Sequence, residues 1–168
     1  MTVELLKIIL DQRPEGQNLL GMDVGKKTIG LALADSSHTV ATPLKTIKRS
    51  KFLKDLKEIE AVVRQYNTGG FVIGYPLNMD GSEGPRCQSV RDFALELERQ
   101  ISDDLFADKK ALWIALWDER LSTVSVEGFV DEVVDMKKRR AKEKGILDKL
   151  AAQHILQGAL DYMHRPKV

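Results

Sequence analysis

Carboxylates at the ends of predicted elements are the residues with the clearest chemical potential. Asp23 stands near the end of an apolar run over residues 19–24, Asp118 and Glu119 close a run over residues 111–117, and Asp148 opens the last helical pattern. Carboxylate oxygens are the ligands that Mg²⁺ and Mn²⁺ prefer. Two such ions can activate water and stabilise the leaving oxygen of a phosphodiester. The pattern therefore indicates metal-dependent phosphodiester hydrolysis, provided that these side chains meet at one end of a sheet.

Each of these carboxylates also has a simpler interpretation. Asp23 precedes a glycine turn and could cap it by accepting backbone hydrogen bonds. Asp148 could be favoured by the dipole at a helix N-terminus, and Glu119 could pair with Arg120 or another surface cation. Because successive side chains of a strand point to opposite faces, only one of Asp118 and Glu119 is expected to face Asp23.

The elements that would position these residues follow an α/β order. Strands are predicted over residues 19–24, 28–35 and 38–47 as an antiparallel meander, and over 71–74 and 111–117. Pro43 places the third strand at a sheet edge, because proline cannot donate to the hydrogen-bond ladder. The later strands follow helical crossovers and should lie parallel to the first. The prediction is a five-stranded mixed sheet flanked by helices over residues 52–66, 85–101, 122–134 and 146–164.

Two further predictions concern the ends of the chain. Residues 1–18 are interpreted as an N-terminal arm or short helix, ended by Pro14 and Gly16, and residues 19–168 as a single domain. The inner face of the last helix is predicted to consist of Leu147, Leu150, Ala151, His154 and Ile155.

Composition narrows the class of protein. The 168 residues carry 26 basic and 25 acidic side chains, so no global field attracts nucleic acid and any such binding must come from local patches. A single cysteine, Cys87, excludes an internal disulfide framework and fits a cytoplasmic protein. No apolar run is long enough to span a bilayer, so no membrane partner is expected. Composition leaves a monomer and a homodimer equally open.

Four ordered segments carry a family resemblance. They read GMDVGKKTIGLA (residues 21–32), PLNMDGSEGPR (76–86), DERLST (118–123) and DKLAA (148–152). Together they resemble the RuvX/YqgF family of pre-16S rRNA nucleases, which are also called Holliday junction resolvase-like proteins. The resemblance covers nearly everything from residue 19 to residue 162. It implies an RNase H-like fold, Mg²⁺- or Mn²⁺-dependent nuclease chemistry, and a role in maturing ribosomal RNA.

The resemblance also assigns residues. The implied metal ligands are Asp23, Glu119 and Asp148, with Asp118 as the rival of Glu119. Two positions depart from the pattern: Lys26 stands where the family usually has threonine, and Gly74 stands where many RNase H-like nucleases keep an acid at the end of the fourth strand. The second departure leaves one or two metal ions open.

Cations near these motifs are candidates for contacts with substrate phosphates. The best placed substrate-binding residues are Lys26, Lys27, Asn78, Arg86 and Arg120. Two clusters could hold flanking backbone or could simply be solvated surface, namely Lys48, Arg49, Ser50 and Lys51, and Lys137, Lys138, Arg139 and Arg140. His154, Trp113 and Trp117 are interpreted as packing residues, and Cys87 is not a candidate nucleophile.

We therefore predict a metal-dependent endonuclease that acts on structured RNA, in 5′-end maturation of pre-16S rRNA. A Holliday junction resolvase acting on DNA is the near alternative, since the same site can cut either polymer. An ATPase-like nucleotide-binding protein is a rival of another class, although the sequence contains no internal repeat to supply its second half. A third rival is a non-catalytic RNA-binding factor in ribosome assembly.

Overall fold

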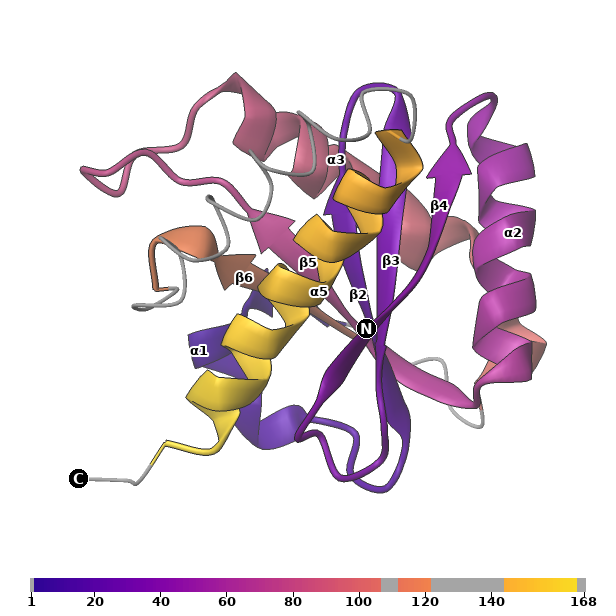
Figure 1. The fold of residues 1–168 in the computed structure, drawn as a ribbon, viewed down its shortest axis with the longest axis horizontal. Coiled ribbons are helices and arrows are strands. Elements are labelled where there is room, and N and C mark those ends of the chain that lie inside the picture. Colours follow the sequence, from indigo (N-terminus) through magenta and orange to yellow (C-terminus); the bar gives the residue numbers. More distant parts are fainter. Residues whose placement is uncertain (1, 107–111, 122–143, 166–168) are drawn as a thin grey trace.

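The computed structural model describes residues 2–106, 112–121 and 144–165, and the strands of this part of the chain form one sheet (Figure 1). The strands are β1 (Thr2–Leu5), β2 (Asn18–Val24), β3 (Thr28–Ala34), β4 (Ala41–Lys48), β5 (Thr68–Tyr75) and β6 (Trp113–Asp118). Their order across the sheet is β1-β6-β5-β2-β3-β4. β2, β3 and β4 form an antiparallel meander, whereas β1, β6, β5 and β2 run parallel. The predicted mixed sheet is confirmed, with six strands instead of five.

The additional strand comes from the N-terminal residues, for which the sequence predicts an arm or short helix. Residues Thr2 to Leu5 pair with Trp113 to Leu116, so β1 covers the outer edge of β6. Only after Leu5 does the chain become helical, in α1 (Leu6–Ile9) and a 3₁₀ turn (Leu10–Gln12). The indole Nε1 of Trp113 donates a hydrogen bond of 2.8 Å to the carbonyl of Ile9, which ties this segment to the sheet. Four residues are too few to show alternation, and their partner strand lies about a hundred residues later.

Helices cover both faces of the sheet (Figure 1). α2 (Phe52–Gln65) and α3 (Pro85–Gln100) pack on one face, and α5 (Lys144–Met163) packs on the other together with α1. The helices predicted over residues 52–66, 85–101 and 146–164 are confirmed to within two residues at each end. The helix predicted over residues 122–134 and the cluster Lys137, Lys138, Arg139 and Arg140 lie outside the described residues. None of the described helices is both long and apolar enough to cross a membrane.

The meander ends at β4, which pairs only with β3 among the described strands. Pro43 of β4 lies opposite Ala32, whereas Lys45 lies opposite Leu31. The register therefore shifts by one residue between these two pairs. An edge strand tolerates proline, since its outward-facing amide positions have no strand partner. The edge position predicted from Pro43 is thus confirmed.

Small residues let α5 approach the sheet closely. A Cβ added at Gly30 would collide with the backbone carbonyl of Asp148, and one at Gly21 would lie 2.7 Å from the Cβ of Leu156. Ala32 and Ala34 continue this small-residue surface and are fully buried. The close contact brings the start of α5 down onto β3, and with it the residue Asp148.

Candidate active site at the ends of the parallel strands

Asp23 lies one residue before the end of β2 and pairs in register with Gly30 of β3. Its side chain is half-buried. Burial raises the pKa of the Asp23 carboxyl above its ordinary value, the negative charge of Asp148 raises it further, and Arg86 opposes both effects. The carboxylate form of Asp23 is therefore poorly solvated and lies close to a second carboxylate.

Glu119 follows β6 as the first residue of a 3₁₀ turn (Glu119–Leu121). Burial, followed by the charge of Asp23, raises the pKa of Glu119 from 4.5 to about 7, while Arg86 acts against this rise. Asp118 contributes a smaller increase. Glu119 and Asp23 thus face a common region although they come from strands separated by β5.

Gly74 of β5 makes this approach possible. A Cβ at Gly74 would lie 2.9 Å from Oε1 of Glu119 and 2.6 Å from Cδ1 of Ile155. The glycine that stands in place of an acid at this strand end therefore leaves the space that the Glu119 carboxylate occupies. Sequence reasoning noticed the missing acid at Gly74 but not this role, because the signal is an absent side chain that acquires meaning only beside Glu119.

Asp148 reaches the site from the first turns of α5. The start of this helix is fixed to the sheet, since the Thr46 hydroxyl of β4 donates a hydrogen bond to the carbonyl of Gly145. Asp23 is electrostatically coupled to both Asp148 and Glu119, and Arg86 near the start of α3 acts on Asp23 and Glu119. We call Asp23, Glu119 and Asp148 the carboxylate cluster.

The carboxylate cluster is not preformed as a metal-binding site. Within the described residues, no three His, Cys, Asp or Glu side chains lie close enough together to hold a metal ion as they stand. Its members are brought to one region by β2, the end of β6 and the start of α5, as the predicted order of elements requires.

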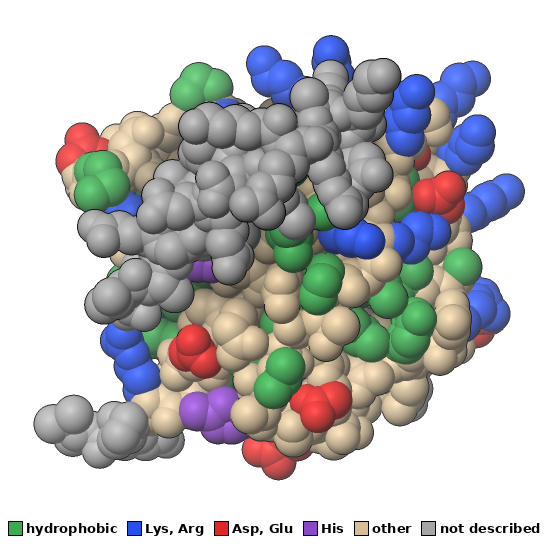
Figure 2. Space-filling model, in the orientation of Figure 1, with side chains coloured by type: hydrophobic (Ala, Val, Ile, Leu, Met, Phe, Trp, Pro, Cys, Tyr) green, Lys and Arg blue, Asp and Glu red, His purple; other side chains and the backbone are tan. Residues whose placement is uncertain are grey.

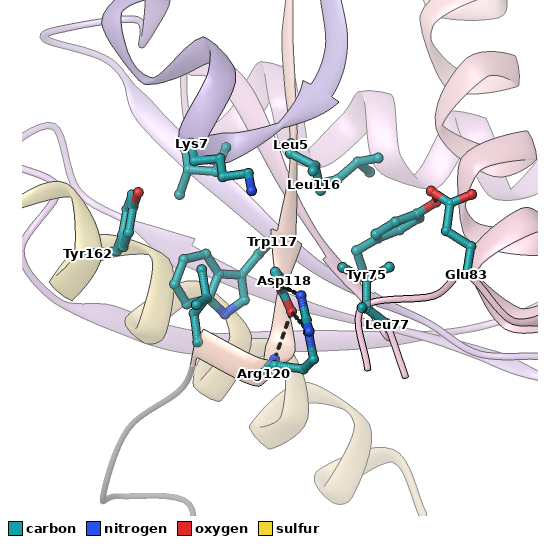
Figure 3. Close-up of a pocket in the computed structure, with 13 residues that line it drawn as sticks. Leu5, Lys7, Tyr75, Leu77, Glu83, Leu116, Trp117, Asp118, Arg120 and Tyr162 are labelled. Carbon is teal, nitrogen blue, oxygen red and sulfur yellow. Dashed lines mark hydrogen bonds and ion pairs between the residues drawn. The ribbon is translucent and has the colours of Figure 1, made fainter. Parts of the chain in front are cut away.

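Asp118 has a different environment from its neighbour Glu119, because it is paired with Arg120 (Figure 3). Oδ2 of Asp118 lies 2.8 Å from Nη2 of Arg120, and Oδ1 accepts hydrogen bonds from the backbone amide and Nε of Arg120 at 3.0 and 3.1 Å. Nη1 of Arg120 also donates to the carbonyl of Met79 at 3.4 Å. Arg120, a predicted substrate contact, is therefore engaged in holding the loop over residues 76–84 against the end of β6.

The other predicted substrate contacts divide into two kinds. Lys26 and Lys27 are exposed in the turn between β2 and β3, directly after Asp23, and Arg86 is exposed beside the cluster. The Asn78 side chain donates instead to the Ser82 hydroxyl at 3.0 Å, within its own loop. Lysines and Arg86 are thus available to a substrate, whereas Asn78 shapes the loop.

Of the residues interpreted as packing residues, the two tryptophans are buried and His154 is half-buried. Trp113 and Trp117 are each 1% exposed. The buried Cys87 thiol donates to the carbonyl of Pro76 at 3.3 Å. Burial lowers the pKa of His154, which favours its neutral form.

A cavity of about 170 Å³ lies beside the Asp118–Arg120 pair (Figure 3). Its wall is mixed, with the apolar side chains of Leu116, Trp117 and Tyr162 beside the charged Lys7 and Glu83. None of the three cluster carboxylates lines it. This cavity is therefore separate from the candidate chemistry.

Solved structures of similar shape define the class of fold. T. thermophilus RuvC in complex with a Holliday junction aligns with a TM-score of 0.50 at 10% identity, covering 88% of this chain and 96% of RuvC. The yeast mitochondrial Holliday junction resolvase aligns with a TM-score of 0.50 at 12% identity, covering 94% and 84%. The protein therefore has the RNase H-like α/β fold of these resolvases, as predicted.

Sequence relatives define the family. A protein of Roseobacter denitrificans is 49% identical over 148 residues, which are 88% of this chain and 85% of the relative. One of Rhodospirillum rubrum is 42% identical over 167 residues, which are 99% and 97%. Both are named as candidate pre-16S rRNA nucleases. The RuvX family, described as Holliday junction resolvase, matches residues 17–162, and the chain belongs to this family.

Proposed function

We propose that the protein is a metal-dependent endonuclease that hydrolyses phosphodiester bonds in structured RNA, in the cytoplasmic 5′-end maturation of pre-16S rRNA. Membership of the RuvX family and the names of the relatives support the activity and the substrate. The observation that carries the proposal is the coupling of Asp23 and Glu119, two half-buried carboxylates whose pKa values are raised, beside Asp148. Isolated buried charges are costly, and such perturbed groups mark functional sites.

A divalent cation, Mg²⁺ or Mn²⁺, fits this donor set. Asp23, Glu119 and Asp148 offer only carboxylate oxygens, and a cation between them would lower the pKa values that burial and mutual repulsion raise. When bound, such an ion supplies an acidified water and neutralises the developing charge on the leaving oxygen. Asp118 is not part of this proposed ligand set, because its two oxygens are engaged by Arg120.

Cations of this chain would position the RNA. Arg86 acts on both Asp23 and Glu119, so its guanidinium is placed to bind the phosphate that is cut. Lys26 and Lys27 extend from the turn after Asp23 toward the neighbouring phosphates. The cluster of Lys137, Lys138, Arg139 and Arg140 keeps its predicted role as a grip on flanking backbone, which a salt-dependence measurement would test.

Cleavage of a branched DNA junction is the second candidate, favoured by the description of the matching family. A junction resolvase cuts two strands and needs two active sites, so a homodimer would support it and a monomer would oppose it. Both activities would use the same carboxylate cluster.

The test is incubation of the pure protein and Mn²⁺ with labelled precursor rRNA, beside a four-way DNA junction. We expect cleavage of the RNA near its mature 5′ end, and loss of at least about 100-fold in rate for Asp23→Asn, since even outer-shell changes at metal sites cost 10–100-fold. Asp35→Asn is the matched control, because Asp35 is exposed at the far end of the β2–β3 hairpin. Cleavage of the junction alone would favour the second candidate, and full activity of Asp23→Asn would overturn both.

A further inference from the structure

A basic hollow of about 470 Å³ lies between the outer edge of β4 and the first turns of α2. Its lining residues are Lys45, Thr46, Lys48, Arg49, Ser50, Lys54, Asp55 and Glu58. Figure 2 shows Lys and Arg side chains gathered on this side of the molecule, at the right of the view. In a chain with 26 basic and 25 acidic residues, such a local imbalance calls for an explanation.

The solvent-exposed charged side chains that line the hollow are mostly positive. Lys45, Lys48 and Lys54 are exposed, and within the described part of the chain none of them belongs to a salt bridge. Asp55 offers them little compensation, because it is 3% exposed and accepts hydrogen bonds from the amide and hydroxyl of Ser50 at 3.1 and 3.2 Å. Three exposed lysines thus face Glu58 as the one exposed acid of the lining.

Arg49 has a structural task and does not belong to this free charge. Its Nη1 donates to the carbonyl of Gly25 at 2.6 Å, and its guanidinium lies 5.6 Å from the ring centre of Phe93. Its backbone amide donates to the carbonyl of Lys27 at 2.9 Å. These bonds fix the hollow to the turn that follows Asp23, so Lys26, Lys27 and the hollow form one basic surface.

The sheet register places the hollow close to the carboxylate cluster. Asp23 lies opposite Gly30, and Gly30 lies opposite Thr46 of the hollow. Two strand spacings separate Asp23 from Thr46, or about 10 Å. Because the start of α5 covers Gly30 and contacts Thr46, backbone leaving Asp23 would reach the hollow along the β2–β3 turn, where Thr28 pairs with Lys48.

We propose that the basic hollow binds the phosphate backbone of the RNA strand that leaves the cleavage site along the β2–β3 turn. The inference rests on the proposed nuclease function and extends it by giving the direction in which the substrate runs. Three ammonium groups that have no salt-bridge partner among the described residues suit phosphates, which they hold without reading sequence. The lysines therefore position the substrate, and the carboxylate cluster cuts it.

The test compares RNA binding by the wild type and by the triple variant Lys45→Gln, Lys48→Gln and Lys54→Gln. The probe is a fluorescein-labelled RNA hairpin with a single-stranded extension, in chelator so that no cleavage occurs. We expect at least about tenfold weaker binding near 0.1 M salt and a log–log salt slope smaller by about 2 to 3, because each lost phosphate contact removes about 0.7–0.9. Replacement of the same three lysines by arginine should restore both values.

A matched variant controls for total charge. It removes three cations at exposed positions away from the hollow, by the changes Arg64→Gln, Arg99→Gln and Arg165→Gln. We expect its salt slope to stay within about 1 unit of the wild-type value. An equal loss in both variants, an unchanged slope in the hollow variant, or binding of the wild type to anionic vesicles but not to RNA would each overturn the inference.

Cleavage assays on the same variants separate this inference from the proposed function. If the wild type cuts RNA and the hollow variant keeps the full salt slope, the hollow fails and the nuclease stands. If the wild type binds RNA through the hollow but never cuts it, the proposed nuclease function is wrong and the hollow remains a nucleic-acid-binding site.

Discussion

Two adjacent residues at the end of β6 show two different uses of a carboxylate. Asp118 is paired with Arg120 through contacts of 2.8 to 3.1 Å, and this pair holds the loop over residues 76–84. Glu119 is half-buried beside Asp23, and its pKa is raised to about 7. The first carboxylate is satisfied by a cation of the chain, whereas the second is left with another carboxylate.

The environments of Asp118 and Glu119 differ in energy as well as in geometry. A rise of the Glu119 pKa from 4.5 to about 7 corresponds to a cost of about 3 kcal/mol for holding its charge in the fold. A partly exposed ion pair such as Asp118–Arg120 contributes at most about 1 kcal/mol. The charge of Asp118 is thus compensated by Arg120 within the chain. The charge of Glu119 destabilises the fold and stands where a bound cation could compensate it.

Replacement of Glu119 and Asp118 by their amides should give the largest difference in activity between the two positions. We expect Glu119→Gln to lower the cleavage rate at least about 100-fold, because it removes a proposed metal ligand. Asp118→Asn should keep the rate within a few-fold and lose at most about 1 kcal/mol of stability, because it weakens only the pair with Arg120. Single-turnover cleavage and denaturant melts of both variants give the measurement.

The opposite ranking would contradict this assignment. If Asp118→Asn abolished cleavage and Glu119→Gln kept it, Asp118 would be the ligand. Equal losses would mean that both carboxylates serve the site.

Gly74→Ala tests whether Glu119 needs the space that the glycine of β5 leaves. The added methyl group would press on Glu119 and Ile155, so overpacking should cost about 1–3 kcal/mol. Displacement of the Glu119 carboxylate should also lower cleavage by about tenfold, as small misplacements of reacting groups do. Gly84→Ala is the control, because its methyl group would meet only the Asn78 side chain, at 3.6 Å. Equal activity of the two variants would show that Glu119 does not need the space above Gly74.

The pH dependence of metal-free stability should show the smallest of these effects. Glu119 has an ordinary pKa of 4.5 when unfolded and about 7 when folded, so the native state binds its proton more tightly. Its contribution is full below pH 4.5 and is lost as pH rises to about 7, up to about 3 kcal/mol. The Glu119→Gln variant should lack this loss, so its advantage over the wild type in chelator should grow between pH 5 and pH 8. A constant difference across this range would mean that Glu119 is not perturbed.

Much of the fold could be predicted because its signals are local. Alternation in the meander, helical spacing, and Pro43 at an edge each lie within a few residues. β1 escaped prediction because it is four residues long and its partner β6 is distant in sequence. The buried face of α5 was predicted wrongly in part, since Ile155 is buried as expected but Ala152, Leu156, Ala159 and Leu160 accompany it. Leucines occur on several sides of this helix, and the glycines of β2 and β3 select the alanine side.

The site could be predicted as a set of residues but not as an arrangement. The order of strands and helices was enough to expect Asp23, Asp148 and one of Asp118 and Glu119 at one sheet end, and the family resemblance favoured Glu119. The role of Gly74 and the pairing of Asp118 with Arg120 depend on side-chain packing between segments distant in sequence. Part of the basic hollow was visible in the sequence within the cluster of Lys48, Arg49, Ser50 and Lys51, but Lys54 joins it only because α2 folds back against β4.

The central claim, that repulsion in the carboxylate cluster is kept for a divalent ion, is tested most directly by melting curves of the wild type and Asp23→Asn in chelator and in Mn²⁺. In chelator the variant should melt at the same temperature or higher, because one of the mutually repelling charges is gone. At an Mn²⁺ concentration about 100 times Kd, the wild type should gain about 5–10 °C and the variant clearly less, with Asp35→Asn following the wild type. A variant that melts lower in chelator and gains as much from Mn²⁺ as the wild type would contradict the account.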